Sequence, residues 1–225
     1  MKKILSAILF SVMVLNAAEF TGGHDSIQCG EKKMRFLKQG TTVLMHKSKG
    51  FLTGSLTVGT KGGYFTFGSA GANGKFTNPE KDFWEYSGSF PEDRKNTRMK
   101  VKLNFELTPH GSIESNLSWT ISDPKNLKDT FYSVSVPMAN FQGKSILLSG
   151  KEVPIANITK YGFFQANDLE NPELVLYHWD KDRKISIQGE GKIRIVFQSV
   201  KDKNVMVRFY PQPAGGTMKL IWQLQ

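Results

Sequence analysis

The stretch Lys100-Val-Lys-Leu-Asn-Phe-Glu-Leu107 is apolar at every odd-numbered position and charged or polar at every even-numbered one. After the turn signal Thr108-Pro-His-Gly111, the same alternation resumes at Ile113 and continues to Ile121. A period of two places alternate side chains on opposite faces of a strand. Proline early in the turn and glycine at its end are typical of a four-residue turn. The two runs therefore predict an antiparallel hairpin with one buried face and one solvated face.

The last fifth of the chain shows the same pattern. Apolar residues alternate with polar or basic ones over 192–197, 204–209 and 218–224. Turn signals at Lys201-Asp-Lys203 and from Pro211 to Gly216 separate these runs. They predict a three-stranded antiparallel meander.

Less regular strands are expected between these elements, at 42–47, 54–58, 64–67, 130–136, 144–148, 161–165 and 173–179. A long series of short strands separated by turn signals favours an all-β fold, an antiparallel two-sheet sandwich that is jelly-roll-like. The longest interruption, 69–96, shows no regular alternation and is interpreted as an irregular loop. Such long loops in a compact domain are often functional.

Residues 1–18 have the pattern of a secretory signal peptide. Lys2 and Lys3 precede an uncharged, mostly apolar run from Ile4 to Leu15, and the small pair Ala17-Ala18 follows. The run is shorter than the roughly 20 apolar residues that span a bilayer, and its order matches a cleaved signal. We therefore expect a secreted or periplasmic bacterial protein, with residues 19–225 as a single β-sandwich domain and no membrane span after cleavage.

The net charge of the chain limits the kinds of partner that we expect. Removal of residues 1–18 takes away two lysines and no acids, so the formal charge falls from +10 to +8. The basic residues are scattered, which suits solubility and the protection of strand edges; the alternative is attraction to a polyanion. For an exported protein, an acidic or sulfated polysaccharide is expected before nucleic acid. Cys29 is the only cysteine, so no internal disulfide is possible.

Catalytic patterns are sparse. The four histidines have no short metal-ligand spacing, and a phosphate-binding loop or a nucleophile elbow does not occur. Hydrolysis of a glycan needs two carboxylates across the scissile bond, and no strand presents such a pair. A lyase needs a set such as Arg208, Tyr210 and His178 to converge, and an ordinary sandwich offers such a trio by chance.

A metal site has one weak pair of candidates. Asp180 and Asp182 lie in the turn expected after Trp179 and offer oxygen ligands for a structural calcium. The favoured interpretation is that these carboxylates bind the backbone of their own turn. No other cofactor is expected.

Aromatic residues give the best candidates for a binding surface, because sugars stack their C–H faces on aromatic rings. Trp119 and Trp222 lie on the apolar faces of alternating strands and are expected in the core. The substrate-binding candidates are the two remaining clusters, Phe83, Trp84 and Tyr86 in the long loop and Tyr177, His178 and Trp179 at a strand end. The alternative for both clusters is that their rings pin loops onto the sandwich.

Residues 98–225 show a resemblance to a known class of module. The segments Phe105-Glu-Leu-Thr-Pro-His-Gly-Ser-Ile113, Leu117-Ser-Trp-Thr-Ile121 and Tyr132-Ser-Val-Ser-Val-Pro137 come first, followed by Phe141-Gln-Gly-Lys144 and Gly150-Lys-Glu-Val-Pro154. This order is similar to accessory β-sandwich modules N-terminal to the catalytic domain of secreted bacterial glycoside hydrolases. Asp182-Arg183 followed by Val205-Met-Val-Arg-Phe209 resembles the closing strands of such modules. The resemblance implies a non-catalytic module linked to polysaccharide breakdown, and it assigns no functional residue.

We therefore expect an exported, non-catalytic, carbohydrate-associated β-sandwich that binds an acidic or neutral polysaccharide through loop aromatics. One alternative is a small sandwich-fold polysaccharide hydrolase or lyase. The other is a periplasmic envelope or assembly protein that binds a protein partner.

Overall fold

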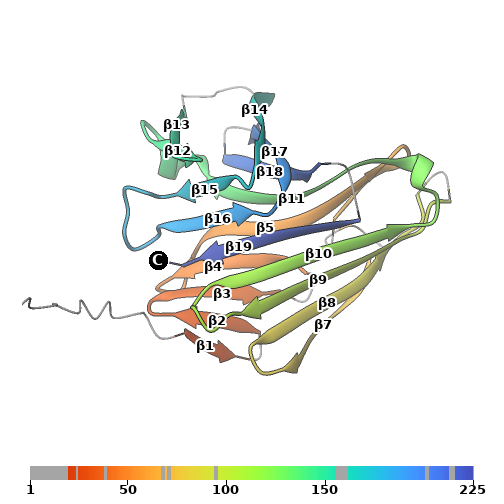
Figure 1. The fold of residues 1–225 in the computed structure, drawn as a ribbon, viewed down its shortest axis with the longest axis horizontal. Coiled ribbons are helices and arrows are strands. Elements are labelled where there is room, and N and C mark those ends of the chain that lie inside the picture. The colour runs from red at the N-terminus through yellow and green to blue at the C-terminus, as the bar shows by residue number, and fades with distance from the viewer. Residues whose placement is uncertain are drawn as a thin grey trace, which may run out of the picture.

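The computed structural model describes residues 20–23, 25–37, 40–66, 69, 72–93, 96–155, 162–200, 203–212 and 216–224. The signal peptide expected at residues 1–18 lies outside this part. Most of the described chain is antiparallel strand, arranged in two sheets that pack face to face (Figure 1). The prediction of an all-β, two-sheet sandwich is confirmed. Among the described residues, no helix is both long enough and apolar enough to cross a membrane.

Sheet A contains ten strands of the described part, with the long strand β5 at its centre. In spatial order they are β1 (Phe20–Gly23), β2 (Ser26–Cys29), β3 (Lys32–Phe36), β4 (Thr42–His46), β5 (Lys49–Thr60), β11 (Leu127–Pro137), β18 (Asn204–Pro211), β17 (Lys192–Val200) and β14 (Gly162–Glu170), with β6 (Gly63–Thr66) also paired to β5. The first half of β5 pairs with β4 and its second half with β6, because β5 is longer than either neighbour.

Sheet B contains nine strands of the described part. In spatial order they are β13 (Lys151–Pro154), β12 (Ser145–Leu148), β15 (Glu173–Leu176), β16 (Ile185–Gly189), β19 (Thr217–Gln223), β10 (Ile113–Ile121), β9 (Met99–Leu107), β8 (Phe83–Phe90) and β7 (Asn73–Glu80). Two 3₁₀ turns, η1 (Pro124–Asn126) and η2 (Met138–Phe141), flank β11. Consecutive strands stay in one sheet over β1–β5 and over β7–β10, so the sheets are wider than those of an eight-stranded jelly roll.

The predicted hairpin at 100–121 is confirmed. Strands β9 and β10 pair in continuous register from Leu107 opposite Ile113 to Met99 opposite Ile121. The odd-numbered residues of the hairpin face sheet A and are mostly buried, while the even-numbered residues face outward. The shorter predicted strands correspond to β4, β5, β6, β11, β12, β14 and β15.

Two expectations about elements are wrong. The segment expected to be an irregular loop contains the hairpin of β7 and β8, which forms an edge of sheet B. In the predicted C-terminal meander, β17 and β18 do pair with each other. Strand β19 instead crosses to sheet B, where it lies between β10 and β16. Alternation fixes the buried face of a strand, but it does not fix which sheet that face must cover.

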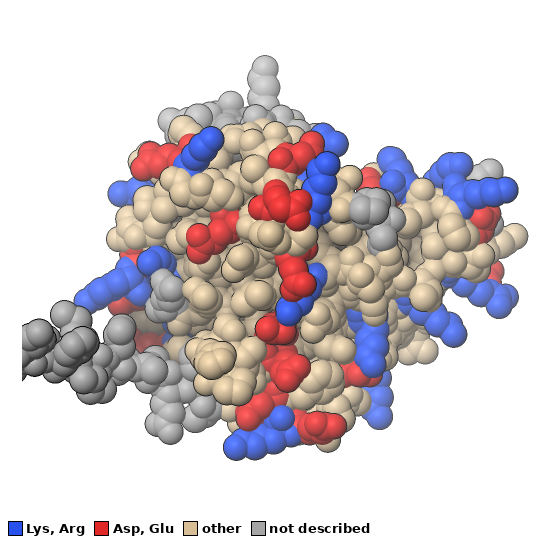
Figure 2. All heavy atoms as spheres, in the orientation of Figure 1, with Lys and Arg blue, Asp and Glu red and all other residues tan. Residues whose placement is uncertain are grey.

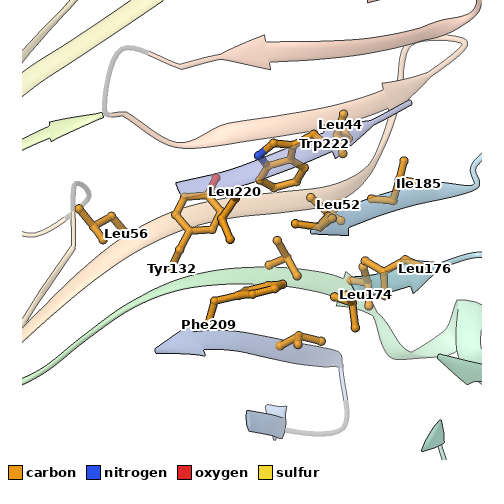
Figure 3. Packing of buried hydrophobic residues seen from close by; sticks show 14 of the residues in the cluster. Leu44, Leu52, Leu56, Tyr132, Leu174, Leu176, Ile185, Phe209, Leu220 and Trp222 are labelled. Carbon is orange, nitrogen blue, oxygen red and sulfur yellow. The ribbon is translucent and has the colours of Figure 1, made fainter. Parts of the chain in front are cut away.

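Both sheets contribute to one hydrophobic core that runs through the described residues. Its centre is shown in Figure 3, where Tyr132 of sheet A and Trp222 of sheet B meet with ring centroids 5.9 Å apart. The Trp222 indole donates a 2.9 Å hydrogen bond to Ser115 Oγ, so the buried N–H has a partner. The expectation that Trp119 and Trp222 belong to the core is confirmed. Cys29 is a buried free thiol whose Sγ donates to Leu224 O at 3.2 Å.

Candidate functional site

The outer face of sheet A, which points away from the core, is hollowed over its central strands. We call the larger depression the central hollow; its volume is about 630 Å³. It is lined by residues of β5, β6, β11, β17 and β18, namely Thr53, Ser55, Thr57, Tyr64, Thr66, Phe131, Ser133, Ser135, Gln198, Met206 and Arg208. Eight of these side chains end in a hydroxyl group or an amide, so the hollow has a mainly polar lining.

Strand register brings these residues together from distant parts of the chain. Ser55 lies opposite Ser133, Ser133 lies opposite Arg208, and Arg208 lies opposite Val196. A second row, two residues further along the strands, runs from Thr53 through Ser135 and Met206 to Gln198. Because side chains alternate across each strand, every residue in both rows faces outward while its neighbours enter the core.

Several outward-facing side chains of the central hollow are nevertheless buried. Gln198 is 2% exposed, Phe131 3% and Ser133 7%. Ser133 Oγ donates to Ser55 O at 3.2 Å. Gln198 Oε1 has no hydrogen-bond partner among the described residues. A buried acceptor without a partner is costly, and this one lines a hollow in which a ligand hydroxyl can supply the missing hydrogen bond.

Arg208 lies over an aromatic ring that lines the central hollow. Its guanidinium carbon is 4.5 Å from the centroid of the Phe131 ring. Its Nη1 donates to Tyr210 Oη at 3.3 Å, and its Nε contacts Met206 Sδ at 3.4 Å. The ring below and the two partners at the edge fix the plane of the guanidinium group.

The rim of the central hollow carries an exposed aromatic ring. Tyr64 on β6 is 50% exposed, and its Oη donates to Asp129 Oδ2 at 3.1 Å across strand β5. Gly59 lies between them in the register. A Cβ at this position would approach Tyr64 Cε1 to 2.7 Å, so the tyrosine and the aspartate meet because residue 59 has no side chain. Lys128 Nζ lies 4.8 Å from the centre of the same ring.

A second depression, here the adjoining hollow, continues along the same strands and has a volume of about 580 Å³. The two hollows share strands. On β11, Asp129 lines the adjoining hollow and Phe131 lines the central one. On β18, Tyr210 lines the adjoining hollow and Arg208 lines the central one. Burial raises the pKa of Tyr210, although the hydrogen bond from Arg208 lowers it. The phenol therefore stays protonated at neutral pH. We call the two hollows together the groove of sheet A.

The first predicted aromatic cluster does not form an exposed surface. Trp84 and Tyr86 lie on β8 rather than in a loop, and they point into the core with 0% and 3% exposure. The Trp84 indole N–H donates to Gly23 O at 2.9 Å. The Trp84 ring also packs 5.4 Å from the ring of Phe36. Phe83 faces the other side of β8 and is half-buried. The expected loop position of these residues is wrong, and buried rings offer no face for a sugar.

The second predicted cluster is partly structural. Tyr177 is fully buried with φ at +55°, a conformation that a bulky residue rarely adopts. Its Oη donates to Phe51 O at 3.0 Å and accepts from Asn140 Nδ2 at 3.1 Å, which ties η2 to sheet A. Trp179 is half-buried and packs edge-on against Phe141, with ring centroids 5.1 Å apart. These contacts match the alternative in which the rings pin the connecting segments.

His178 does not join Arg208 and Tyr210. Its Nε2 lies 3.3 Å from Ser145 Oγ on β12, at an edge region of sheet B. Arg208 and Tyr210 do meet on the outer face of sheet A. The trio that a lyase would need is therefore divided between the two sheets.

The carboxylate of Asp180 also has a local explanation. Asp180 Oδ1 accepts from Asp182 N at 3.0 Å, and its Oδ2 accepts from Arg183 Nε at 2.7 Å. Both carboxylate oxygens of Asp180 thus have donors within the same turn. Among the described residues, no group of three or more His, Cys, Asp or Glu side chains is arranged to hold a metal ion.

Sequence reasoning missed most of the groove. The Ser and Thr residues at alternate positions of β5 and β11 have the appearance of an ordinary solvated face, and the strands that line the groove come from distant parts of the chain. One signal was available in Met206, Arg208 and Tyr210, which share the outward face of a single strand. Comparison with models of known protein families and with curated proteins found no match.

Proposed function

We propose that this chain is an exported, non-catalytic β-sandwich that binds a polysaccharide in the groove of sheet A. The observation that carries the proposal is the central hollow itself, which joins buried hydroxyl and amide groups on its floor to an exposed aromatic ring at its rim. Its volume lies within the usual range of ligand pockets, roughly 300–1,000 Å³.

The chemistry of the lining suits sugars. A sugar unit presents hydroxyl groups, which need donors and acceptors, and C–H faces, which pack on rings. Ser55, Ser133 and Gln198 supply the polar partners, and Tyr64 supplies an accessible ring. The unpartnered Gln198 Oε1 would accept a hydrogen bond from a bound hydroxyl.

Binding fits this lining better than bond cleavage does. Among the described residues that line the two hollows, Asp129 is the one carboxylate, and it already accepts from Tyr64. Glycoside hydrolysis by the usual route needs two carboxylates on either side of the scissile bond. A lyase arrangement would need a base near Arg208 and Tyr210, and His178 bonds with sheet B instead.

The rest of the proposal comes from the sequence. The pattern of residues 1–18 supports export to the periplasm or beyond. The similarity of residues 98–225 to accessory modules of glycoside hydrolases supports a role beside a polysaccharide-degrading activity. A protein partner in the envelope remains the competing proposal, and it predicts a co-purifying protein and no response to sugars.

The test uses a variant that fills the central hollow. Ser133→Trp places a large ring on the outward face of β11, where serine now lies on the floor. The matched control is Ser118→Trp, which puts the same ring on the outward face of β10 in sheet B, between Lys102 and Thr217. Binding is measured by retardation of the purified protein in gels that contain laminarin, polygalacturonate or a sulfated galactan.

We expect the wild type and Ser118→Trp to be retarded equally by at least one polymer. Ser133→Trp should lose at least tenfold in affinity for that polymer while it unfolds at a similar urea concentration. Full retention of affinity by a folded Ser133→Trp would rule out the groove. Zones of depolymerised glycan around the wild-type band would overturn the non-catalytic assignment.

A further inference from the structure

Arg208 is the one charged side chain among the described residues that line the central hollow. The other lining side chains are hydroxyl, amide, thioether or aromatic groups. A charge among neutral neighbours dominates the electrostatic potential of its pocket, because nearby low-dielectric walls reduce screening by water.

The guanidinium group is also held in one orientation. Phe131 supports its face, and Tyr210 and Met206 contact its edge. The Phe131 side chain is itself 3% exposed and packs against Tyr210 with ring centroids 4.9 Å apart. A fixed planar fork loses little conformational entropy when it binds a carboxylate or sulfate through two hydrogen bonds.

Positive charge continues into the adjoining hollow. Lys128 and Arg194 line it together with Asp129. Arg194 lies opposite Tyr210 on the neighbouring strand, so it is adjacent to the row that contains Arg208. The lining of the whole groove therefore combines three cations with one carboxylate, which already accepts a hydrogen bond from Tyr64.

We infer that the groove of sheet A takes a polysaccharide with anionic substituents, and that Arg208 binds a carboxylate or sulfate group of the sugar in the central hollow. The inference rests on the proposed function and adds the chemical class of the ligand. Gln198 and the serine hydroxyls would then contact uncharged hydroxyl groups of the same chain.

The experiment compares polymers that share a backbone and differ in charge. Polygalacturonate is paired with its methyl ester, and a sulfated galactan is paired with the same galactan after desulfation. The proteins are wild type, Arg208→Gln, Arg208→Lys and Lys219→Gln. Lys219 lies on the outer face of sheet B and is the control that changes net charge by the same amount.

We expect the wild type to bind the charged member of one pair at least tenfold more tightly than the neutral member. The pair that shows the preference identifies the group as carboxylate or sulfate. Arg208→Gln should bind both members equally, at the wild-type affinity for the neutral one, and Lys219→Gln should keep the preference. Arg208→Lys keeps the charge but not the planar fork, so its preference should fall several-fold.

Other outcomes distinguish a failure of the anionic-ligand inference from a failure of the proposed function. Equal wild-type binding to charged and neutral members, together with loss of both in Ser133→Trp, would refute the anionic inference and leave the proposed function standing. Undiminished binding by Ser133→Trp would refute the proposed function. Equal losses in Arg208→Gln and Lys219→Gln, or equal retardation of the wild type by single-stranded DNA, would mean general attraction to polyanions and would overturn the role of Arg208. A wild type that binds none of the four polymers would refute both.

Discussion

The outer faces of the two sheets differ in the charge and burial of their polar side chains. On sheet B, the outward residues of β8, β9, β10 and β19 pair their charges at the surface. Lys219 Nζ contacts Glu114 at 3.0 Å and Glu190 at 3.2 Å, and Lys102 contacts Glu85 at 2.8 Å. Figure 2 views this face and shows Asp and Glu side chains down its middle, with Lys and Arg among and beside them.

On sheet A, the outward residues of β5, β11, β17 and β18 are mostly uncharged, and several are buried. Gln198 is 2% exposed and Thr57 6%, whereas Lys102 on sheet B is 49% exposed. Charged side chains at the surface form ion pairs and are hydrated by water. A buried amide such as that of Gln198 has an oxygen without a hydrogen-bond partner. Period-two alternation therefore identifies which side chains of a strand face outward. It does not show whether that outward face is exposed to solvent or lies in a hollow.

The largest expected effect concerns where each sheet places its aromatic rings. Trp84→Ala on sheet B removes a fully buried ring and should lower the free energy of unfolding by about 3–5 kcal/mol. Tyr64→Ala on sheet A removes a half-exposed ring and should cost less than about 1 kcal/mol, while it weakens glycan binding. Urea unfolding and gel retardation of both variants check the contrast. A stable Trp84→Ala variant with weakened binding would reverse it.

A smaller effect is expected at the glycine that lets the rim of the groove form. Gly59→Ala introduces a Cβ within 2.7 Å of Tyr64 Cε1 and should separate Tyr64 from Asp129. We expect a loss of about 1–3 kcal/mol in stability and a several-fold loss in affinity. Gly162→Ala on β14 is the control, because its Cβ would meet open space, and it should change stability by less than about 0.5 kcal/mol. Thermal melts measure the stability of both variants, and titrations measure their glycan affinity. Equal stability and affinity of Gly59→Ala and Gly162→Ala would contradict the close contact between residue 59 and Tyr64.

The smallest effect lies on the outer face of sheet B. The hydrogen bond from Lys102 holds the pKa of Glu85 below its usual value, with a further contribution from Ser87. Because the folded-state pKa is lowered, the stabilisation is present above about pH 4.5 and is lost as the pH falls through the folded-state value. Glu85→Gln should therefore be less stable than wild type by at most about 1 kcal/mol at pH 7, and the difference should be smaller at pH 3.

Urea unfolding of wild type and Glu85→Gln at the two pH values measures this difference. Glycan affinity at pH 7 should be the same for both proteins, since the substitution is on the other sheet. A shared loss of affinity would show that the two faces do not act independently.

The strands that could be predicted from the sequence are those in which apolar and polar residues alternate along the whole length. The hairpin at 100–121 is the clearest case, because charged and apolar residues alternate through both strands. Strand β8 was missed although Trp84, Tyr86 and Phe90 all point inward at even spacing. Gly88 interrupts that pattern, because its Cβ would lie 2.8 Å from Asn73 O on the neighbouring strand. The partner β7 has no buried residue and hence no alternation to detect.

The candidate site was harder to predict than the fold. The sequence named Arg208 and Tyr210 only in a chance trio with His178. Ser55, Ser133 and Gln198 join them through the order of strands in sheet A. That order depends on pairings between residues more than seventy positions apart, such as Ser133 with Ser55. The aromatic clusters misled for a related reason, since an indole next to charged residues in sequence can still point into the core, as Trp84 does.

The crossing of β19 into the middle of sheet B has a consequence for the order of folding. Until residues 217–223 are available, β10 and β16 have no strand between them, and sheet B remains in two separate pieces. The pairing of Ile113 with Trp222 closes a loop of more than a hundred residues, and such long-range contacts form slowly. A chain synthesised from its N-terminus therefore stays incompletely folded until strand β19 has emerged. For the export that we propose, this delay would keep the chain competent for passage through a narrow translocation channel.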